Sequence, residues 1–99
     1  MNILIVGGNR FFGKGLLDRL SKKKNLNIYI INRGNRKIDK KILKKKNIHF
    51  LKCDRKNIKN LKLNLSNIKF QIVFDNCAYN LKDVKNLLNI IGKQNVFYI

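Results

Sequence analysis

Apolar residues along the chain gather in short runs, which alternate with longer segments where they recur every three or four positions. The short runs are rich in β-branched and aromatic residues, a composition typical of strands. They predict strands over Asn2–Val6, Asn27–Ile31, Asn47–Lys52, Gln71–Asp75 and Asn95–Ile99. The first run is apolar without a break from Ile3 to Val6, which indicates a central parallel strand covered on both faces.

The segments between these runs predict crossover helices. Apolar residues share one helical face over Phe12–Leu20, Ile38–Leu43 and Val84–Ile91. Ile58–Ile68 is also spaced for a short helix, although Leu61, Leu63 and Leu65 alternate as they would in a strand. Strands joined by right-handed crossovers form a parallel sheet. We therefore expect one α/β domain over residues 1–99, a Rossmann-type sheet of about five strands in the order 3-2-1-4-5 with helices on both faces.

A glycine-rich loop follows the first strand directly and opens the first predicted helix. Its sequence is Gly7-Gly8-Asn9-Arg10-Phe11-Phe12-Gly13. A dinucleotide fold needs glycine here for a tight turn and for close packing of helix on strand, and N–H groups at the helix start bind the pyrophosphate. Gly7 and Gly13 fit these roles, while Arg10 replaces the glycine that usually stands between them. We expect the whole loop to bind a dinucleotide cofactor.

Two other interpretations of this loop carry less weight. Gly8, Gly13 and Lys14 fit the first seven positions of the P-loop pattern, but Gly15 stands where a Ser or Thr hydroxyl should hold magnesium. Glycines that serve only a turn are the plainer alternative.

The end of the second predicted strand bears on the choice between NAD and NADP. NAD-binding domains usually place an acid there for the ribose 2′-hydroxyl, whereas an Arg accommodates the 2′-phosphate of NADP. The chain has Asn32-Arg33-Gly34 at this place, with Arg36 shortly after and no acid among them. We therefore expect Asn32, Arg33 and Arg36 to bind the cofactor and predict NADP, with NAD as the alternative. The plainer interpretation is that both arginines are merely cations on a basic surface.

Together these pieces resemble the NAD-dependent epimerase/dehydratase branch of the extended or atypical short-chain dehydrogenase/reductase superfamily, whose members carry a GG-x-R-F-x-G loop. The match also includes Cys53-Asp54-Arg55 after the third strand and Asp75-Asn76-Cys77-Ala78-Tyr79 after the fourth. The resemblance implies that the loop backbone near Arg10, Phe11 and Phe12 holds the pyrophosphate. It also implies that Asp54 contacts adenine, with Arg55 beside it in the site, and that Asn76, Cys77 and Ala78 line the cofactor ribose.

The same resemblance implies a catalytic part that these 99 residues lack. In the family a Ser or Thr and a Tyr-x-x-x-Lys pair follow the fifth strand, and neither Tyr29, Tyr79 nor Tyr98 has a lysine four positions later. We therefore expect the cofactor-binding part of an oxidoreductase or epimerase, in a truncated form that turns over no substrate unless the missing C-terminal half comes from elsewhere. The open edge of the fifth strand would favour self-association.

The charge of the chain supports a competing interpretation. Its 23 Lys and Arg residues against 5 acids give +18, which by itself indicates a nucleic-acid partner, an RNA-binding module on the same fold. However, Lys, Asn and Ile supply 18, 16 and 14 residues, and all three have A/T-rich codons. The lysines are also dispersed, without the interleaved aromatics on which single strands stack. Dinucleotide binding therefore ranks first.

The remaining features argue against other classes of protein. No apolar run approaches the roughly 20 residues of a membrane span and no secretory signal begins the chain, so we expect a cytoplasmic protein without membrane contact. Cys53 and Cys77 are too few and too far apart for a zinc site, and His49 stands in an apolar stretch, so we interpret all three as structural. The predicted strand order also keeps the two cysteines beyond disulfide reach.

Overall fold

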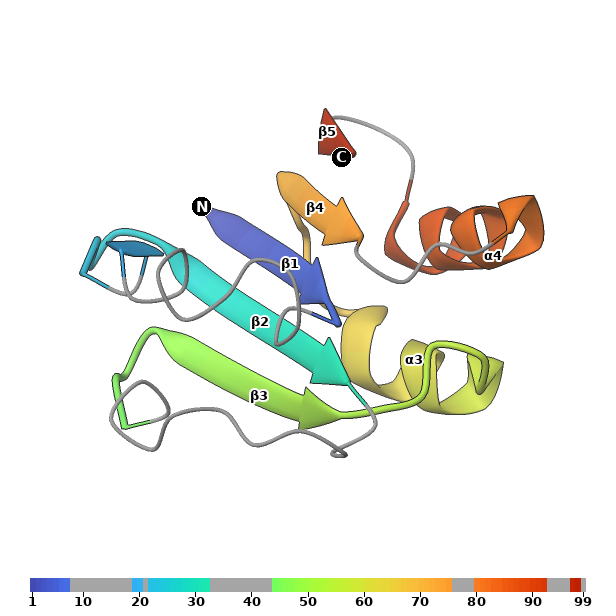
Figure 1. The fold of residues 1–99 in the computed structure, drawn as a ribbon, viewed down its shortest axis with the longest axis horizontal. Coiled ribbons are helices and arrows are strands. Elements are labelled where there is room, and N and C mark those ends of the chain that lie inside the picture. Colours follow the sequence, from blue (N-terminus) through green and yellow to red (C-terminus); the bar gives the residue numbers. More distant parts are fainter. Residues whose placement is uncertain (8–18, 21, 33–43, 76–79, 93–96, 99) are drawn as a thin grey trace.

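The computed structural model describes residues 1–7, 19–20, 22–32, 44–75, 80–92 and 97–98. These ranges contain the strands β1 (Asn2–Val6), β2 (Asn27–Asn32), β3 (Ile48–Lys52), β4 (Ile72–Asp75) and β5 (Phe97–Tyr98), and the helices α3 (Ile58–Leu65) and α4 (Leu81–Ile91). The strands form one sheet in the order β3-β2-β1-β4-β5, and every neighbouring pair is parallel (Figure 1). The predicted fold class and strand order are confirmed.

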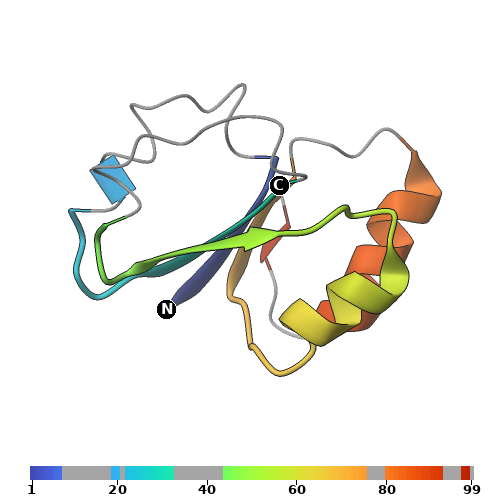
Figure 2. The same cartoon turned by 90° about the horizontal axis from the view of Figure 1, so that it is seen from below.

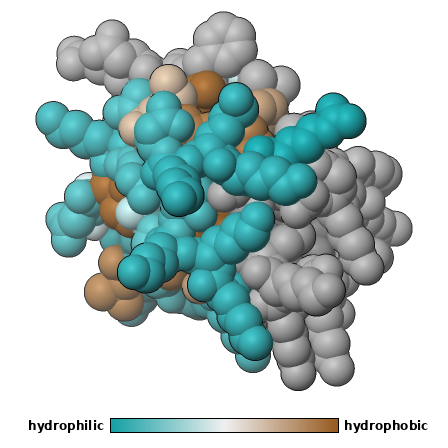
Figure 3. All heavy atoms as spheres, turned by 90° about the vertical axis from the view of Figure 1, so that its left-hand side faces the viewer, coloured by the Kyte–Doolittle hydropathy of each residue, from teal (hydrophilic) through white to brown (hydrophobic). Residues whose placement is uncertain are grey.

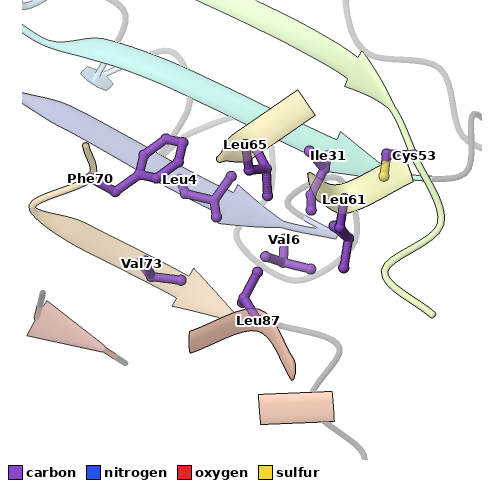
Figure 4. Packing of buried hydrophobic residues seen from close by; sticks show 9 residues of the cluster. All are labelled: Leu4, Val6, Ile31, Cys53, Leu61, Leu65, Phe70, Val73 and Leu87. Atoms are coloured by element: carbon purple, nitrogen blue, oxygen red, sulfur yellow. The ribbon is translucent and has the colours of Figure 1, made fainter. Parts of the chain in front are cut away.

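The central strand β1 is buried on both faces, as its unbroken apolar run predicted. Successive side chains of a strand point to opposite faces, so its residues divide between two clusters. Ile3 and Ile5 join Ile28 and Ile30 of β2 on one face. Leu4 and Val6 lie on the other face, in a second cluster completed by Ile31, Cys53, Leu61, Leu65, Phe70, Val73 and Leu87 (Figure 4). The two helices α3 and α4 supply Leu61, Leu65 and Leu87, so they cover this second face, which we call the α3/α4 face.

The segment with two competing patterns is a helix. Leu61 and Leu65 are both fully buried, whereas Leu63 between them is 82% exposed. Residues four apart lie on the same face of a helix, while a strand would place Leu63 on the same side as the other two leucines. Figure 2 shows α3 and α4 side by side beneath the sheet, and the two helices contact each other. The helical spacing was therefore the correct interpretation.

Asparagine side chains fix where these helices begin, and a glycine ends α4. The Asn57 side chain accepts a hydrogen bond of 3.1 Å from the N–H of Asn60, and the Asn80 side chain accepts one of 2.9 Å from Asp83. Each satisfies an N–H group that the first turn leaves without a helical partner. At the other end of α4, Gly92 adopts a φ of 86°, a conformation that favours glycine and stops the helix.

On the opposite face of the sheet, the structure describes one short helical piece, residues 19–20. Leu20, which with Arg19 is helical, packs against the cluster of Ile3, Ile5 and Ile28. Most of the predicted helix Phe12–Leu20, all of Ile38–Leu43 and the outer residues of the predicted fifth strand lie outside the described ranges.

The cysteine and histidine expected to be structural lie in packed surroundings. Cys53 is buried as a free thiol, and burial, followed by the charge of Asp54, raises its pKa. The ring of His49 stacks on Tyr29 with centroids 4.6 Å apart, and Tyr29 meets Phe70 edge to face. Cys77 lies outside the described residues. Within the described ranges, no group of three potential metal ligands occurs and no helix could span a membrane.

The packing of α3 yields a stability prediction with an internal control. Leu65→Ala should lower the free energy of unfolding by about 2 to 5 kcal/mol, because it opens a cavity in the α3/α4 face. Leu63→Ala, the same change two residues earlier, should cost no more than about 0.5 kcal/mol because Leu63 is exposed. Urea unfolding followed by circular dichroism measures both values, and equal losses would contradict the helical register.

Candidate functional site

The carboxyl ends of the parallel strands meet at one edge of the sheet, which we call the carboxyl edge. It brings together Gly7 after β1, Asn32 at the end of β2, Asp54 after β3 and Asp75 at the end of β4. The strand order reverses beside β1, since β2 lies on one side of it and β4 on the other. Crossovers that leave such a point in opposite directions open a crevice, where α/β sheets bind their ligands. Of the predicted site residues, the structure describes Gly7, Asn32 and Asp54 along this edge, and Arg55 beside Asp54.

Gly7 makes the turn that leaves the sheet at the reversal. Its φ is 69°, in the left-handed region that side-chain-bearing residues rarely adopt, and its N–H donates a hydrogen bond of 2.8 Å to the carbonyl of Ile31. The turn thus remains tied to β2 while it points the chain out of the sheet. The rest of the predicted phosphate loop, which comprises Gly8, Asn9, Arg10, Phe11, Phe12 and Gly13, lies outside the described residues.

Asn32 and Asp54 lie at the carboxyl edge on the β2 side of β1. The carbonyl of Asn32 accepts a hydrogen bond of 2.7 Å from the N–H of Cys53, which continues the pairing of β2 with β3. Asp54 is partly exposed, and its Oδ1 accepts a hydrogen bond of 3.0 Å from the N–H of Lys56. This contact fixes the carboxylate in a turn. Its predicted contact with adenine stays a prediction, and Arg33, Arg36, Asn76, Cys77 and Ala78 lie outside the described residues.

Arg55, predicted at the same place, turns inward. Its Nη1 forms an ion pair with Oδ1 of Asp75, and its Nη2 donates a hydrogen bond of 2.9 Å to the backbone carbonyl of Asp83 in the first turn of α4. The Arg55 side chain is 7% exposed and that of Asp75 is fully buried. A buried ion pair persists only when the partners are well hydrogen-bonded. The contacts described for Arg55 are thus with the protein, and its contact with a cofactor stays a prediction.

Asp75 is also bound from β5. The Tyr98 hydroxyl donates a hydrogen bond of 2.5 Å to Oδ2 of Asp75, so both oxygens of this carboxylate accept hydrogen bonds. Burial raises the pKa of Tyr98, and the hydrogen bond and charge of Asp75 raise it further, while Arg55 partly offsets them. The phenol therefore keeps its proton at neutral pH and acts as a donor.

This network of Arg55, Asp75 and Tyr98 joins the loop after β3 to the ends of β4 and β5 and to the start of α4. In the sequence, Asp75 stands out only as part of a family motif, and Tyr98 only as a tyrosine without the lysine that a catalytic pair needs. One signal could have found the network: an acid that ends the apolar run Ile72–Phe74 is predicted to be buried and therefore needs a cationic partner. Which cation supplies it, however, depends on how the loop after β3 folds back beneath the sheet.

The buried pair makes a prediction about stability. Arg55→Met should lower the free energy of unfolding by about 3 to 5 kcal/mol, because it leaves the Asp75 carboxylate buried without its cation. Tyr98→Phe, which removes the hydroxyl that donates to the same carboxylate, should cost about 1 to 2 kcal/mol. The double variant Arg55→Met/Asp75→Asn should lose less free energy of unfolding than the sum of the losses in Arg55→Met and Asp75→Asn measured separately. Additive losses in urea unfolding would contradict a direct interaction.

A second prediction concerns the titration of Tyr98. The tyrosinate absorbance of the wild type minus that of Tyr98→Phe isolates this one phenol, and the difference should rise only well above pH about 10. In denaturant the same difference should centre near pH about 10. Because the folded pKa is raised, the stability that this phenol contributes is complete below pH about 10 and is lost as the pH rises through the folded value. A folded difference curve centred near pH about 10 would refute the buried hydrogen bond.

No family model matches the chain, and no curated protein matches its sequence. The solved structure of a short-chain dehydrogenase/reductase from Veillonella parvula, in complex with NADP, has a TM-score of 0.78 at 16% identity and covers 98% of this chain and 45% of that one.

Two sugar-nucleotide enzymes show the same likeness. A dTDP-glucose 4,6-dehydratase from Bacillus anthracis, in complex with NAD, has a TM-score of 0.74 at 20% identity over 99% of this chain and 36% of that one. A UDP-glucose 4-epimerase from Stenotrophomonas maltophila with bound NAD has a TM-score of 0.68 at 12% identity over 99% and 36%. This chain therefore spans less than half the length of these structures. Its fold is the one shared by short-chain dehydrogenases/reductases and by the epimerases and dehydratases that resemble them.

Proposed function

We propose that residues 1–99 bind a nicotinamide dinucleotide, as the cofactor-binding part of an oxidoreductase or epimerase of the extended short-chain dehydrogenase/reductase kind. The observation that carries this proposal is the reversal of strand order beside β1, with Gly7 at a φ of 69° where the chain leaves the sheet. A left-handed glycine at this point lets the following backbone approach a pyrophosphate closely. The glycine-rich sequence Gly7–Gly13 then supplies the N–H groups.

The proposed cofactor contacts follow the carboxyl edge. The pyrophosphate is assigned to the Gly7–Gly13 loop, the adenosine to Asn32, Arg33, Arg36 and Asp54, and the cofactor ribose to the segment Asn76–Ala78. Asn32 and Asp54 support this assignment because both lie at the carboxyl ends of strands on the β2 side of the reversal. Asp75 supports it on the other side, since its buried carboxylate fixes the end of β4 from which Asn76 follows.

We further propose NADP as the preferred dinucleotide. The argument is electrostatic: Arg33 follows β2 directly, where NAD-binding domains usually carry an acid, and a guanidinium binds a phosphate dianion through charge and paired N–H donors. The structural neighbours support a dinucleotide without deciding between the two, because the Veillonella parvula structure holds NADP and the Bacillus anthracis structure holds NAD.

Titration calorimetry with NADPH and NADH tests both levels of the proposal, the binding of a dinucleotide and the preference for NADP. The wild type should bind NADPH more tightly than NADH. Arg33→Ala should weaken NADPH by about 1 to 3 kcal/mol, roughly 5- to 150-fold, and leave NADH nearly unchanged, because only NADPH carries the 2′-phosphate. Lys59→Ala, which removes an exposed cation from α3, is the control for a general loss of charge.

The outcomes separate the two levels. Equal weakening of NADPH and NADH by Arg33→Ala would remove the preference for NADP while leaving dinucleotide binding intact. Absence of binding for both dinucleotides to the folded wild-type chain would overturn the proposed function itself.

A further inference from the structure

The edge of the sheet opposite the proposed cofactor site carries lysines from loops far apart in the sequence. We call it the amino edge and define it by residues 1–2, 22–27, 44–47 and 66–71. Because the strands are parallel, their amino ends meet here, just as their carboxyl ends meet at the cofactor site. Seven lysines lie within these ranges: Lys22, Lys23, Lys24, Lys44, Lys45, Lys46 and Lys69. All except the partly buried Lys45 are exposed, and Figure 3 shows extended hydrophilic side chains across this face.

Hydrogen bonds hold the lysine-bearing loops beside each other. Asn47 Nδ2 donates to the carbonyls of Lys23 at 3.2 Å and Leu26 at 3.1 Å, which fastens the loop before β3 to the loop before β2. Asn2 Nδ2 donates to the carbonyl of Lys69 at 2.9 Å, which fixes the loop before β4 against the start of β1. These contacts hold the backbones of the lysine-bearing loops next to one another or to the start of β1 along the sheet edge.

The described acids all lie away from the amino edge. The acids Asp54, Asp75 and Asp83 all follow the carboxyl ends of β3 or β4, and two of them belong to the buried network around Arg55. The four ranges of the amino edge contain no Asp or Glu. Positive charge therefore dominates this edge, and clustered charge of one sign attracts an extended anion.

The four ranges of the amino edge expose no aromatic ring, which favours a double helix over a single strand. From β3 to β4 there are three inter-strand steps, roughly 14 Å. A nucleic-acid duplex carries one phosphate charge per about 1.7 Å of its axis, so about eight phosphates lie along the same length. Single strands need exposed aromatic rings for stacking, and the only aromatic residue in the four ranges, Phe70, is buried. We infer that the amino edge binds the phosphate backbone of a double-stranded nucleic acid without base specificity, while the carboxyl edge stays free for the dinucleotide.

Two fourfold variants with equal charge test this inference. The edge variant Lys23→Gln/Lys24→Gln/Lys44→Gln/Lys46→Gln removes two lysines each from the loops before β2 and β3. The control variant Lys59→Gln/Lys62→Gln/Lys82→Gln/Lys85→Gln removes two exposed lysines each from α3 and α4. Binding of a duplex of about 20 base pairs is measured by fluorescence anisotropy over a range of salt concentrations. The edge variant should flatten the slope of log K against log salt by about 2 or more, which weakens binding roughly 60-fold or more at ~0.1 M salt, while the control should change the slope by less than about 1.

Several results would overturn the inference. Equal losses in the two variants would mean that binding follows net charge and has no localised site. Tight binding to vesicles of anionic phospholipid through the edge lysines, with no duplex binding, would assign the edge to a membrane surface.

If the edge variant does not fold, as judged by circular dichroism, the pairs Lys23→Gln/Lys24→Gln and Lys44→Gln/Lys46→Gln should each reproduce about half of the change in slope. Saturating NADPH should leave the slope unchanged, and duplex binding by a chain that binds no dinucleotide would separate this inference from the proposed function.

Discussion

The fold depends on one constraint: β1 must be paired and covered on every side. Its residues Ile3 to Val6 are all buried, with side chains in both core clusters, and its backbone is hydrogen-bonded to β2 on one side and β4 on the other. Parallel partners can be reached only through crossover connections. The chain must therefore place one partner to each side of β1, and the reversal of strand order beside β1 follows from that requirement.

The buried network at the carboxyl edge serves a different purpose from the apolar core. The carboxylate of Asp75 binds Arg55 and Tyr98 at once, and Arg55 also reaches the first turn of α4. Directional hydrogen bonds between buried charges restrict position more strongly than non-directional apolar contacts do. The network thus fixes the backbone from which the proposed ribose-binding segment continues.

Charge is arranged by the same parallel geometry. A parallel sheet gives the chain two edges of different composition, since all loops that follow strands gather at one edge and all loops that precede them gather at the other. The described acids lie toward the carboxyl edge, where Asp54 is partly exposed and Asp75 forms a buried ion pair with Arg55. The amino edge collects lysines from three loops. An overall charge of +18 therefore says less about partners than the place where the charge is concentrated.

The sequence by itself determined the elements and their order. An unbroken apolar run marked β1 as central, residues spaced four apart marked α3 and α4 as helices, and the alternation of strands with helices left few topologies other than the one observed. It also located Gly7 at the reversal of strand order, because this glycine directly follows the buried central strand. These inferences succeed because periodicity and turn chemistry are local properties.

Only the tertiary structure decided which distant residues meet. Nothing local indicates that Arg55 turns under the sheet to Asp75, or that Tyr98 completes the same carboxylate, because these contacts span 20 and 23 positions and depend on how the loop after β3 folds back. The lysines before β2 and those before β3 are likewise far apart in the sequence. They lie along one edge because Asn47 joins the two loops at the start of these parallel strands. Long-range pairing depends on the relative positions of whole elements, and no single segment of sequence encodes it.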